Sequence, residues 1–159
     1  MGYEVGPKRG VANHYGPRNA DNQYGGQDNS VGKVKSASWE FDYDDLPAYN
    51  AGNLAQQIPA NAVLVSAHLV VEEAFTSGSS HTMTMGLTNA SSGSVVDVDG
   101  LATASELTNA LLIVKGSYIK GAGALIDKTI GTAACQLTLT PSHTLTAGKG
   151  KIIVHYIYN

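Results

Sequence analysis

Apolar and polar side chains alternate over residues 35–43 of the chain. Ala37, Trp39, Phe41 and Tyr43 occupy the odd positions, and serines and acidic residues occupy the even ones. A period of two predicts a β-strand with one face buried. We therefore expect the single tryptophan to lie in the hydrophobic core.

The same period returns after a turn-rich stretch at residues 44–57. A long strand is predicted over residues 62–75, because five aliphatic side chains fall in phase, at Val63, Val65, Ala67, Leu69 and Val71. The small polar residues 77–80 then form a turn, and a second strand follows over residues 81–87. We predict that these two strands pair as a hairpin.

Further short strands follow, with one helix between them. The predicted strands cover residues 94–98, 116–120, 125–130, 134–140 and 150–158, and a helix over residues 101–112 is predicted with Asp99 as its N-cap. Seven or eight short strands without a tandem repeat predict an all-β, jelly-roll-like β-sandwich. The last strand is apolar on both faces, which predicts a central place in a sheet or a partner.

Composition changes abruptly near Trp39. Residues 1–38 contain no Leu, Ile, Phe or Trp and are rich in Gly, Asn and Asp, so they cannot form a core of their own. The sequence thus predicts two parts, an extended N-terminal arm at residues 1–38 and a β-sandwich body at residues 39–159. Ordering such an arm costs backbone entropy, and a partner surface must supply the compensating contacts.

The arm contains residue types that are enriched at protein interfaces. Both arginines of the protein lie in it, together with three tyrosines, and Tyr and Arg combine large contact area with hydrogen bonding. A disordered tail is the alternative. We predict that the partner-binding residues of the arm are Tyr3, Arg9, Tyr15, Arg18 and Tyr24, with Trp39 holding the root of the arm to the body.

The charge and hydropathy of the chain argue against two classes of partner, nucleic acids and membranes. The formal net charge of -3 argues against binding to a nucleic-acid backbone. The longest apolar run, residues 62–71, is interrupted by Ser66 and His68, and the N-terminus has no apolar leader, so we expect a protein made in a cytoplasm that spans no membrane. A single cysteine, Cys135, permits no intrachain disulfide.

Candidate chemistry is sparse. Glu40 and Asp42 share the polar face of the first strand and are predicted to be solvated, or to accept arginines from an arm or a partner. Asp97 and Asp99 begin like a calcium loop but lack its later ligands, and Cys135 is in phase with buried leucines. The five histidines are scattered. The sequence therefore predicts no catalytic residues, no metal site and no cofactor.

The order of these pieces resembles small virion proteins of tailed bacteriophages. The resemblance rests on the Tyr/Arg/Gly-rich arm, the Trp-Glu-Phe-Asp-Tyr strand at residues 39–43, Ile-Pro-Ala-Asn-Ala-Val at 58–63 and the closing strand at 146–156. The chain is similar to capsid cement, or decoration, proteins. This resemblance implies a jelly-roll body on the capsid exterior, assembled in the host cytoplasm, which binds major capsid protein subunits, often as a homodimer.

Two other functions fit the same pattern. The first is a tail-fibre or receptor-binding head that binds host surface glycan through exposed tyrosines and acidic loops. The second is a free carbohydrate-active enzyme or lectin, which would need paired carboxylates at a suitable separation. The chain has no repetitive or coiled-coil stretch to set the symmetry of a fibre, so the cement function is preferred.

Overall fold

The computed structural model describes residues 13–15, 27–29, 34–50 and 57–158 of the 159-residue chain. The chain divides into two compact units, Met1–Lys33 and Val34–Asn159. In the first unit, β1 (Asn13–Tyr15) pairs antiparallel with β2 (Gln27–Asn29).

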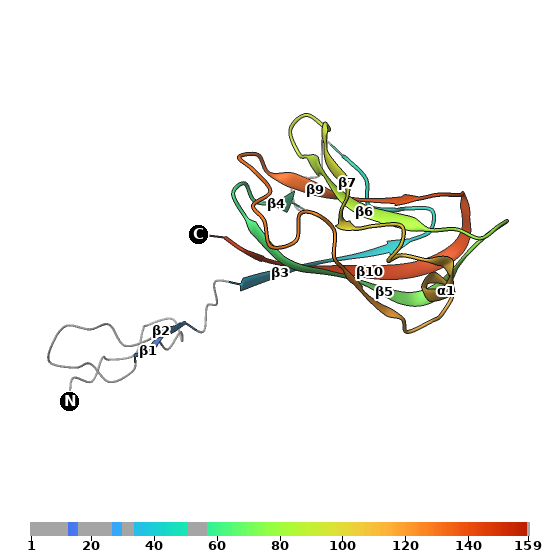
Figure 1. The fold of residues 1–159 in the computed structure, drawn as a ribbon, viewed down its shortest axis with the longest axis horizontal. Coiled ribbons are helices and arrows are strands. Elements are labelled where there is room, and N and C mark those ends of the chain that lie inside the picture. Colours follow the sequence, from blue (N-terminus) through green and yellow to red (C-terminus); the bar gives the residue numbers. More distant parts are fainter. Residues whose placement is uncertain (1–12, 16–26, 30–33, 51–56, 159) are drawn as a thin grey trace, which may run out of the picture. The chain divides into compact units, whose positions relative to one another are not determined.

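The second unit is a β-sandwich with one short helix (Figure 1). Its elements are β3 (Val34–Asp42), β4 (Gln57–Ile58), β5 (Val63–Ser77), β6 (Met83–Asn89), β7 (Val95–Ala102), α1 (Asn109–Leu112), β8 (Tyr118–Gly121), β9 (Cys135–Pro141) and β10 (Leu145–Ile157).

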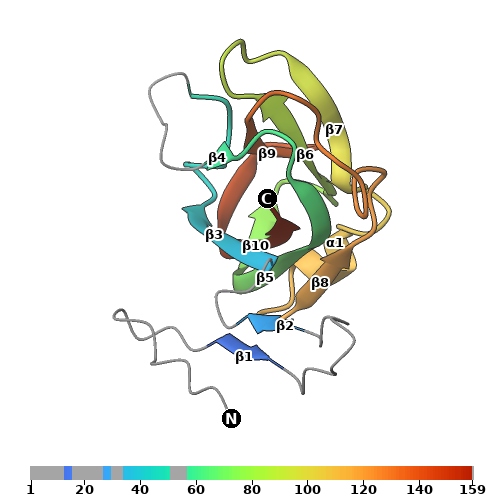
Figure 2. The same cartoon turned by 90° about the vertical axis from the view of Figure 1, so that its left-hand side faces the viewer.

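The eight strands of the body form two four-stranded antiparallel sheets, in the orders β3-β10-β5-β8 and β4-β9-β6-β7. The pairing is nested: β6 pairs with β7, β5 with β8, β4 with β9 and β3 with β10. This is the topology of one long hairpin rolled up, which is a jelly roll. Figure 2 shows the two sheets facing each other. The predicted all-β, jelly-roll-like sandwich is confirmed.

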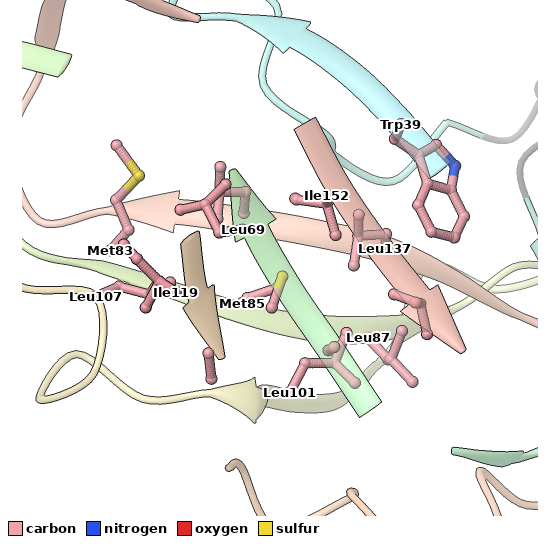
Figure 3. Close-up of a cluster of buried hydrophobic side chains, with 14 of the residues drawn as sticks. Trp39, Leu69, Met83, Met85, Leu87, Leu101, Leu107, Ile119, Leu137 and Ile152 are labelled. Atoms are coloured by element: carbon pink, nitrogen blue, oxygen red, sulfur yellow. The ribbon is translucent and has the colours of Figure 1, made fainter. Parts of the chain in front are cut away.

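The core lies between the two sheets and is almost wholly apolar. Figure 3 shows Leu69 of β5 and Ile152 of β10 in the same cluster as Met85 and Leu87 of β6. All four side chains are fully buried. Burial of this kind contributes on the order of 1.5–3 kcal/mol for each large side chain and is the main source of stability in a fold of this size.

The first and last strands of the body follow the sequence prediction. On β3, Trp39 and Phe41 are buried and Glu40 and Asp42 are exposed, as the alternation indicates. On β10, which lies between β3 and β5, the apolar residues of both faces are covered or half-covered because the strand is central in its sheet. β3 begins at Val34, so residues 34–38, which were predicted to be part of the arm, belong to the sheet.

The predicted hairpin of residues 62–75 and 81–87 is wrong. β5 and β6 lie in opposite sheets, and the connection at residues 78–82 crosses from one sheet to the other. The predicted alternation of buried and exposed side chains along β5 is also interrupted. Tyr156 lies opposite Leu64 and His155 opposite Ser66, so Val65 is an extra residue in the ladder, and Leu64 is the buried residue at this end.

The predicted helix over residues 101–112 is also wrong in most of its length. β7 extends to Ala102, which pairs with Met85, so Asp99 lies in a strand and caps no helix. A turn follows, in which the Thr103 backbone N–H donates to Glu106 Oε2 at 2.7 Å. Only Asn109–Leu112 is helical.

Residues 125–130 were predicted to be a strand and instead form a turn beside β5. The Leu64 backbone N–H donates to the Lys128 carbonyl at 3.0 Å, and the Asp127 N–H donates to the Leu64 carbonyl at 2.8 Å. The backbone φ of Asp127 is 62°, a left-handed conformation that interrupts an extended strand. An isolated antiparallel bridge between Thr129 and Val63 is the β-structure that these residues form.

Candidate binding groove

A cleft of about 540 Å³ lies beside β3 on the body of the protein. We call it the β3 groove. It is lined by Trp39, Glu40 and Phe41 of β3, by residues 45–50 and by Gln136 and Leu137 of β9. Its volume is within the range of sites that bind small molecules or a few residues of peptide.

The groove forms because the two sheets are unequal at this edge. β3 has nine residues and pairs on one side with β10, whereas β4 has only two residues and covers little of β9. The chain before β4 takes its place: the Leu139 backbone N–H donates to the Pro47 carbonyl at 2.8 Å. The segment is also fixed at Asn50, whose backbone exchanges two hydrogen bonds of 2.9 Å with the Gln136 side chain.

The accessible surface of the groove is mostly polar and rests on an apolar base. Trp39 and Phe41 are buried below it, with Leu46 and Leu137 packed at their side. Asp45 and Tyr49 lie exposed on the rim. Such a surface would hold a ligand mainly by charge and hydrogen bonds.

The two predicted acidic acceptors, Glu40 and Asp42, lie exposed on β3 and are paired within the chain. Lys151 Nζ lies 2.9 Å from Glu40 Oε1, and Lys149 Nζ lies 3.6 Å from Asp42 Oδ1. The hydrogen bond to Glu40 raises the pKa of Lys151. These lysines stand directly opposite on β10, so an incoming arginine would have to share or displace them. The acceptor function of this face stays a prediction.

The predicted arm contacts lie mostly outside the described residues. Tyr3, Arg9, Arg18 and Tyr24 belong to ranges that the structure does not describe. Tyr15 ends β1, opposite Gln27 of β2. Trp39, the predicted root of the arm, is 4% exposed, which confirms its burial, while its function as an anchor for the arm stays a prediction.

The outer face of the β3-β10-β5-β8 sheet carries a histidine cluster that was not predicted from the sequence. His68 of β5 stacks on Tyr118 of β8 and meets the ring of His155 of β10 edge-on. His155 Nδ1 is 3.0 Å from Ser66 Oγ. The residues are far apart in sequence and come together only through strand register, so no spacing rule reveals them.

The other candidate residues, Cys135, Asp97 and Asp99, lack the features of catalytic or metal-binding groups. Cys135 is buried, which raises the pKa of its thiol, and a neutral buried thiol is a poor nucleophile. The pKa of Asp99 is raised, first by a hydrogen bond with Asp97. In the described ranges, three or more His, Cys, Asp or Glu side chains nowhere gather as metal ligands would.

Over the same ranges, none of the helices has the length and apolarity to cross a membrane.

Neither the protein-family models nor the curated proteins match this sequence. The fold is similar to solved structures. A chain of "Acidic stable capsid structure of Helicobacter pylori bacteriophage KHP30" matches with a TM-score of 0.51 and 17% identity, over 79% of this chain and 87% of that chain. Chains of "Cyanophage Pam1 capsid asymmetric unit" and "Capsid of Ralstonia phage GP4" give TM-scores of 0.46 and 0.47, with identities of 16% and 23%. Each covers 79% of this chain and 85% of its own.

Proposed function

We propose that this chain is a non-enzymatic structural protein of a tailed bacteriophage, which binds the outside of the capsid and holds neighbouring major capsid protein subunits together. The observation that carries the proposal is a jelly-roll body, similar in fold to a chain of a phage capsid structure, preceded in the sequence by a segment without Leu, Ile, Phe or Trp. The order of sequence motifs, which resembles cement proteins, supports the same function.

In this function, the two parts of the chain have different tasks. The body supplies a folded unit whose hydrophobic core lies within Val34–Asn159. The arm supplies the contacts with capsid subunits, through Tyr3, Arg9, Tyr15, Arg18 and Tyr24. Glu40 and Asp42 offer carboxylates to arginines of a partner, and the protein acts as a homodimer on the virion without a cofactor.

Many weak contacts are sufficient for such a protein. Each copy that bridges two capsid subunits adds apolar area and hydrogen bonds that must break before the shell opens. Because one arm and one body are linked, the second contact forms at a high effective concentration. A modest gain at each site therefore becomes a large gain over a whole shell.

The test is co-sedimentation of the purified protein with undecorated capsids of its phage. The full chain is compared with a variant that lacks residues 1–33, a cut that leaves all of β3 in the body. We expect saturable binding by the full chain and a large loss on truncation, with a parallel loss of capsid heat resistance. Binding that survives truncation would move the contact to the body. Absence of binding by both proteins would overturn the proposal and favour the glycan-binding tail-fibre head, which a glycan array tests.

A further inference from the structure

We propose that the β3 groove binds a short extended stretch from residues 5–20 of a second copy of this chain. This stretch adds as a strand to the free edge of β3, and the pairing of Asn13–Tyr15 with β2 is given up in the exchange. The inference deepens the homodimer of the proposed function, on which it rests for its biological setting. It does not require capsid binding, and it is tested without capsids.

The first support is the unpaired edge of β3. Among the described residues, β3 pairs only with β10, so alternate backbone N–H and C=O groups along its nine residues point to the open side. Edges of this kind bind extended peptides by strand addition, in which main-chain hydrogen bonds give affinity and side-chain pockets give specificity.

The second support is the shape of the site. Residues 45–50 form the opposite wall of the groove and are tied to β9 by the Asn50 and Gln136 hydrogen bonds. A space of about 540 Å³ between this wall and β3 admits one extended chain over Trp39. The wall blocks the approach of a whole folded sheet, which argues against direct pairing of two β3 strands over residues 39–41.

The third support is charge complementarity. Glu40 and Asp42 are paired with Lys151 and Lys149, whereas Asp44 and Asp45 form no ion pair with another described residue. The end of β3 and the rim of the groove therefore carry net negative charge. Residues 5–20 contain Lys8, Arg9 and Arg18 and no acidic residue, which gives this segment a formal charge of +3. It is the strongly basic part of an otherwise acidic protein.

The stretch between the basic segment and β3 is long enough for the segment to be exchanged between two copies. Residue 20 lies 14 positions before Val34, and 14 extended residues span up to about 46 Å at ~3.3 Å per residue. A globular unit of the size of the body has a radius of gyration of about 14 Å. The segment can therefore leave one body and reach a neighbouring one.

The test places a photo-crosslinking residue, p-benzoylphenylalanine, at Ala48 in the full chain. Ala48 is exposed and lines the groove. ¹⁴N-labelled and ¹⁵N-labelled proteins are unfolded, mixed, refolded and irradiated, and cross-linked peptides are identified by mass spectrometry. We expect adducts with residues 5–20, with mixed-label pairs as frequent as same-label pairs. Adducts in same-label pairs only would assign the segment to its own chain, and adducts elsewhere or none would also overturn the proposal.

The control is the same cross-linker at Tyr118, which is 61% exposed on β8, the other edge strand of the same sheet. Tyr118 does not line the β3 groove, so we expect no adducts with residues 5–20. Equal labelling from both edges would indicate nonspecific contact and overturn the proposal.

A charge exchange gives a second measurement. Asp45→Lys alone, or Arg9→Glu with Arg18→Glu, should weaken dimerisation roughly tenfold in sedimentation equilibrium, because like charges then meet. Mixing the two variants should restore dimers, since the acidic segment of one fits the basic groove of the other. Wild-type protein that stays monomeric, or variants that dimerise as well as wild type, would overturn the proposal. Capsid binding is not measured here, so failure of the proposed function would be seen separately.

Discussion

The imidazole of His68 stacks on the phenol ring of Tyr118, with ring centroids 4.7 Å apart and an interplanar angle of 22°. The His155 ring meets His68 from the side at 6.0 Å. His68 is only 9% exposed, although it lies on the outer face of its sheet, and its Nδ1 has no hydrogen-bond partner among the described residues. Burial, followed by the charges of His155 and Lys120, lowers the pKa of His68 below its ordinary value of 6.5.

This stack predicts that the free energy of unfolding falls in mild acid. The folded pKa of His68 lies below the unfolded one, so the unfolded chain binds the proton more tightly. Stability from this group is therefore complete above about pH 6.5 and is lost as the pH falls towards the folded pKa. His81, whose pKa is also lowered mainly by burial, adds to the loss with the same sign. Urea unfolding between about pH 8 and pH 5 measures the loss.

Two variants separate the contribution of His68 to this loss of stability from the contribution of His81. His68→Gln should make the decline with acid shallower, and only the part due to His81 should remain. Tyr118→Ala should act in the same direction, because it removes the ring that covers His68. A decline as steep as wild type in both variants would contradict this account.

Replacement of Trp39 should be among the most destabilising single changes. Trp39 is 4% exposed and packs in the core below the β3 groove. Trp39→Ala should cost about 3–5 kcal/mol, from lost burial and the cavity that remains. Tyr43→Ala, at a 39% exposed site directly after β3, is the matched aromatic control and should cost much less. Equal midpoints in urea for the two variants would show that Trp39 does not anchor the core.

Gly86 of β6 lies where β7 passes too close for a side chain. A Cβ at this position would lie 2.1 Å from the Asp97 carbonyl oxygen and 2.5 Å from the Val98 backbone. Since backbone atoms cannot turn aside, Gly86→Ala should cost about 1–3 kcal/mol or more. Gly78→Ala has no atom within 4 Å of the new methyl group and should be close to neutral. The midpoints of thermal unfolding of the two variants show how much the steric clash at Gly86 costs.

Cys135 should be unreactive in the folded protein. Its side chain is fully buried, and burial raises the pKa of the thiol, so both access and thiolate population are low. An aromatic disulfide reagent at about pH 8 should label it at the rate of unfolding, and at once in denaturant. Fast labelling under native conditions would mean that β9 opens locally.

The strands that have a clear pattern of apolar side chains could be predicted from the sequence. Elements whose conformation depends on contacts between residues far apart in the sequence could not. The alternation around Trp39 locates β3, and the two-sided apolar pattern near Ile152 places β10 at the centre of its sheet. The apolar spacing from Leu101 to Leu112 resembles a helix, but pairing of Ala102 with Met85 extends β7 instead. Tertiary contacts here override local propensity.

The groove and the histidine cluster could not be predicted for a related reason. The β3 groove joins Trp39, Tyr49 and Leu137, and the stack joins His68 with Tyr118. A period of two tells which face of a strand is apolar, and it gives no information on the neighbouring strand. The polar turn at residues 77–80 likewise gave no sign that the chain crosses to the other sheet.

The nested strand order also determines when this protein can fold during its synthesis. β3 and β10 pair residues that are 107 to 123 positions apart, from Asp42 with Lys149 to Val34 with Ile157. Until the ribosome has released residues 145–157, β3 and β5 have no common neighbour and Trp39 has no finished sheet to join. Such non-local pairing makes folding slow and leaves strand edges open to aggregation in the meantime. Growing chains of this protein therefore expose the edges of β3 and β5 until β10 has emerged.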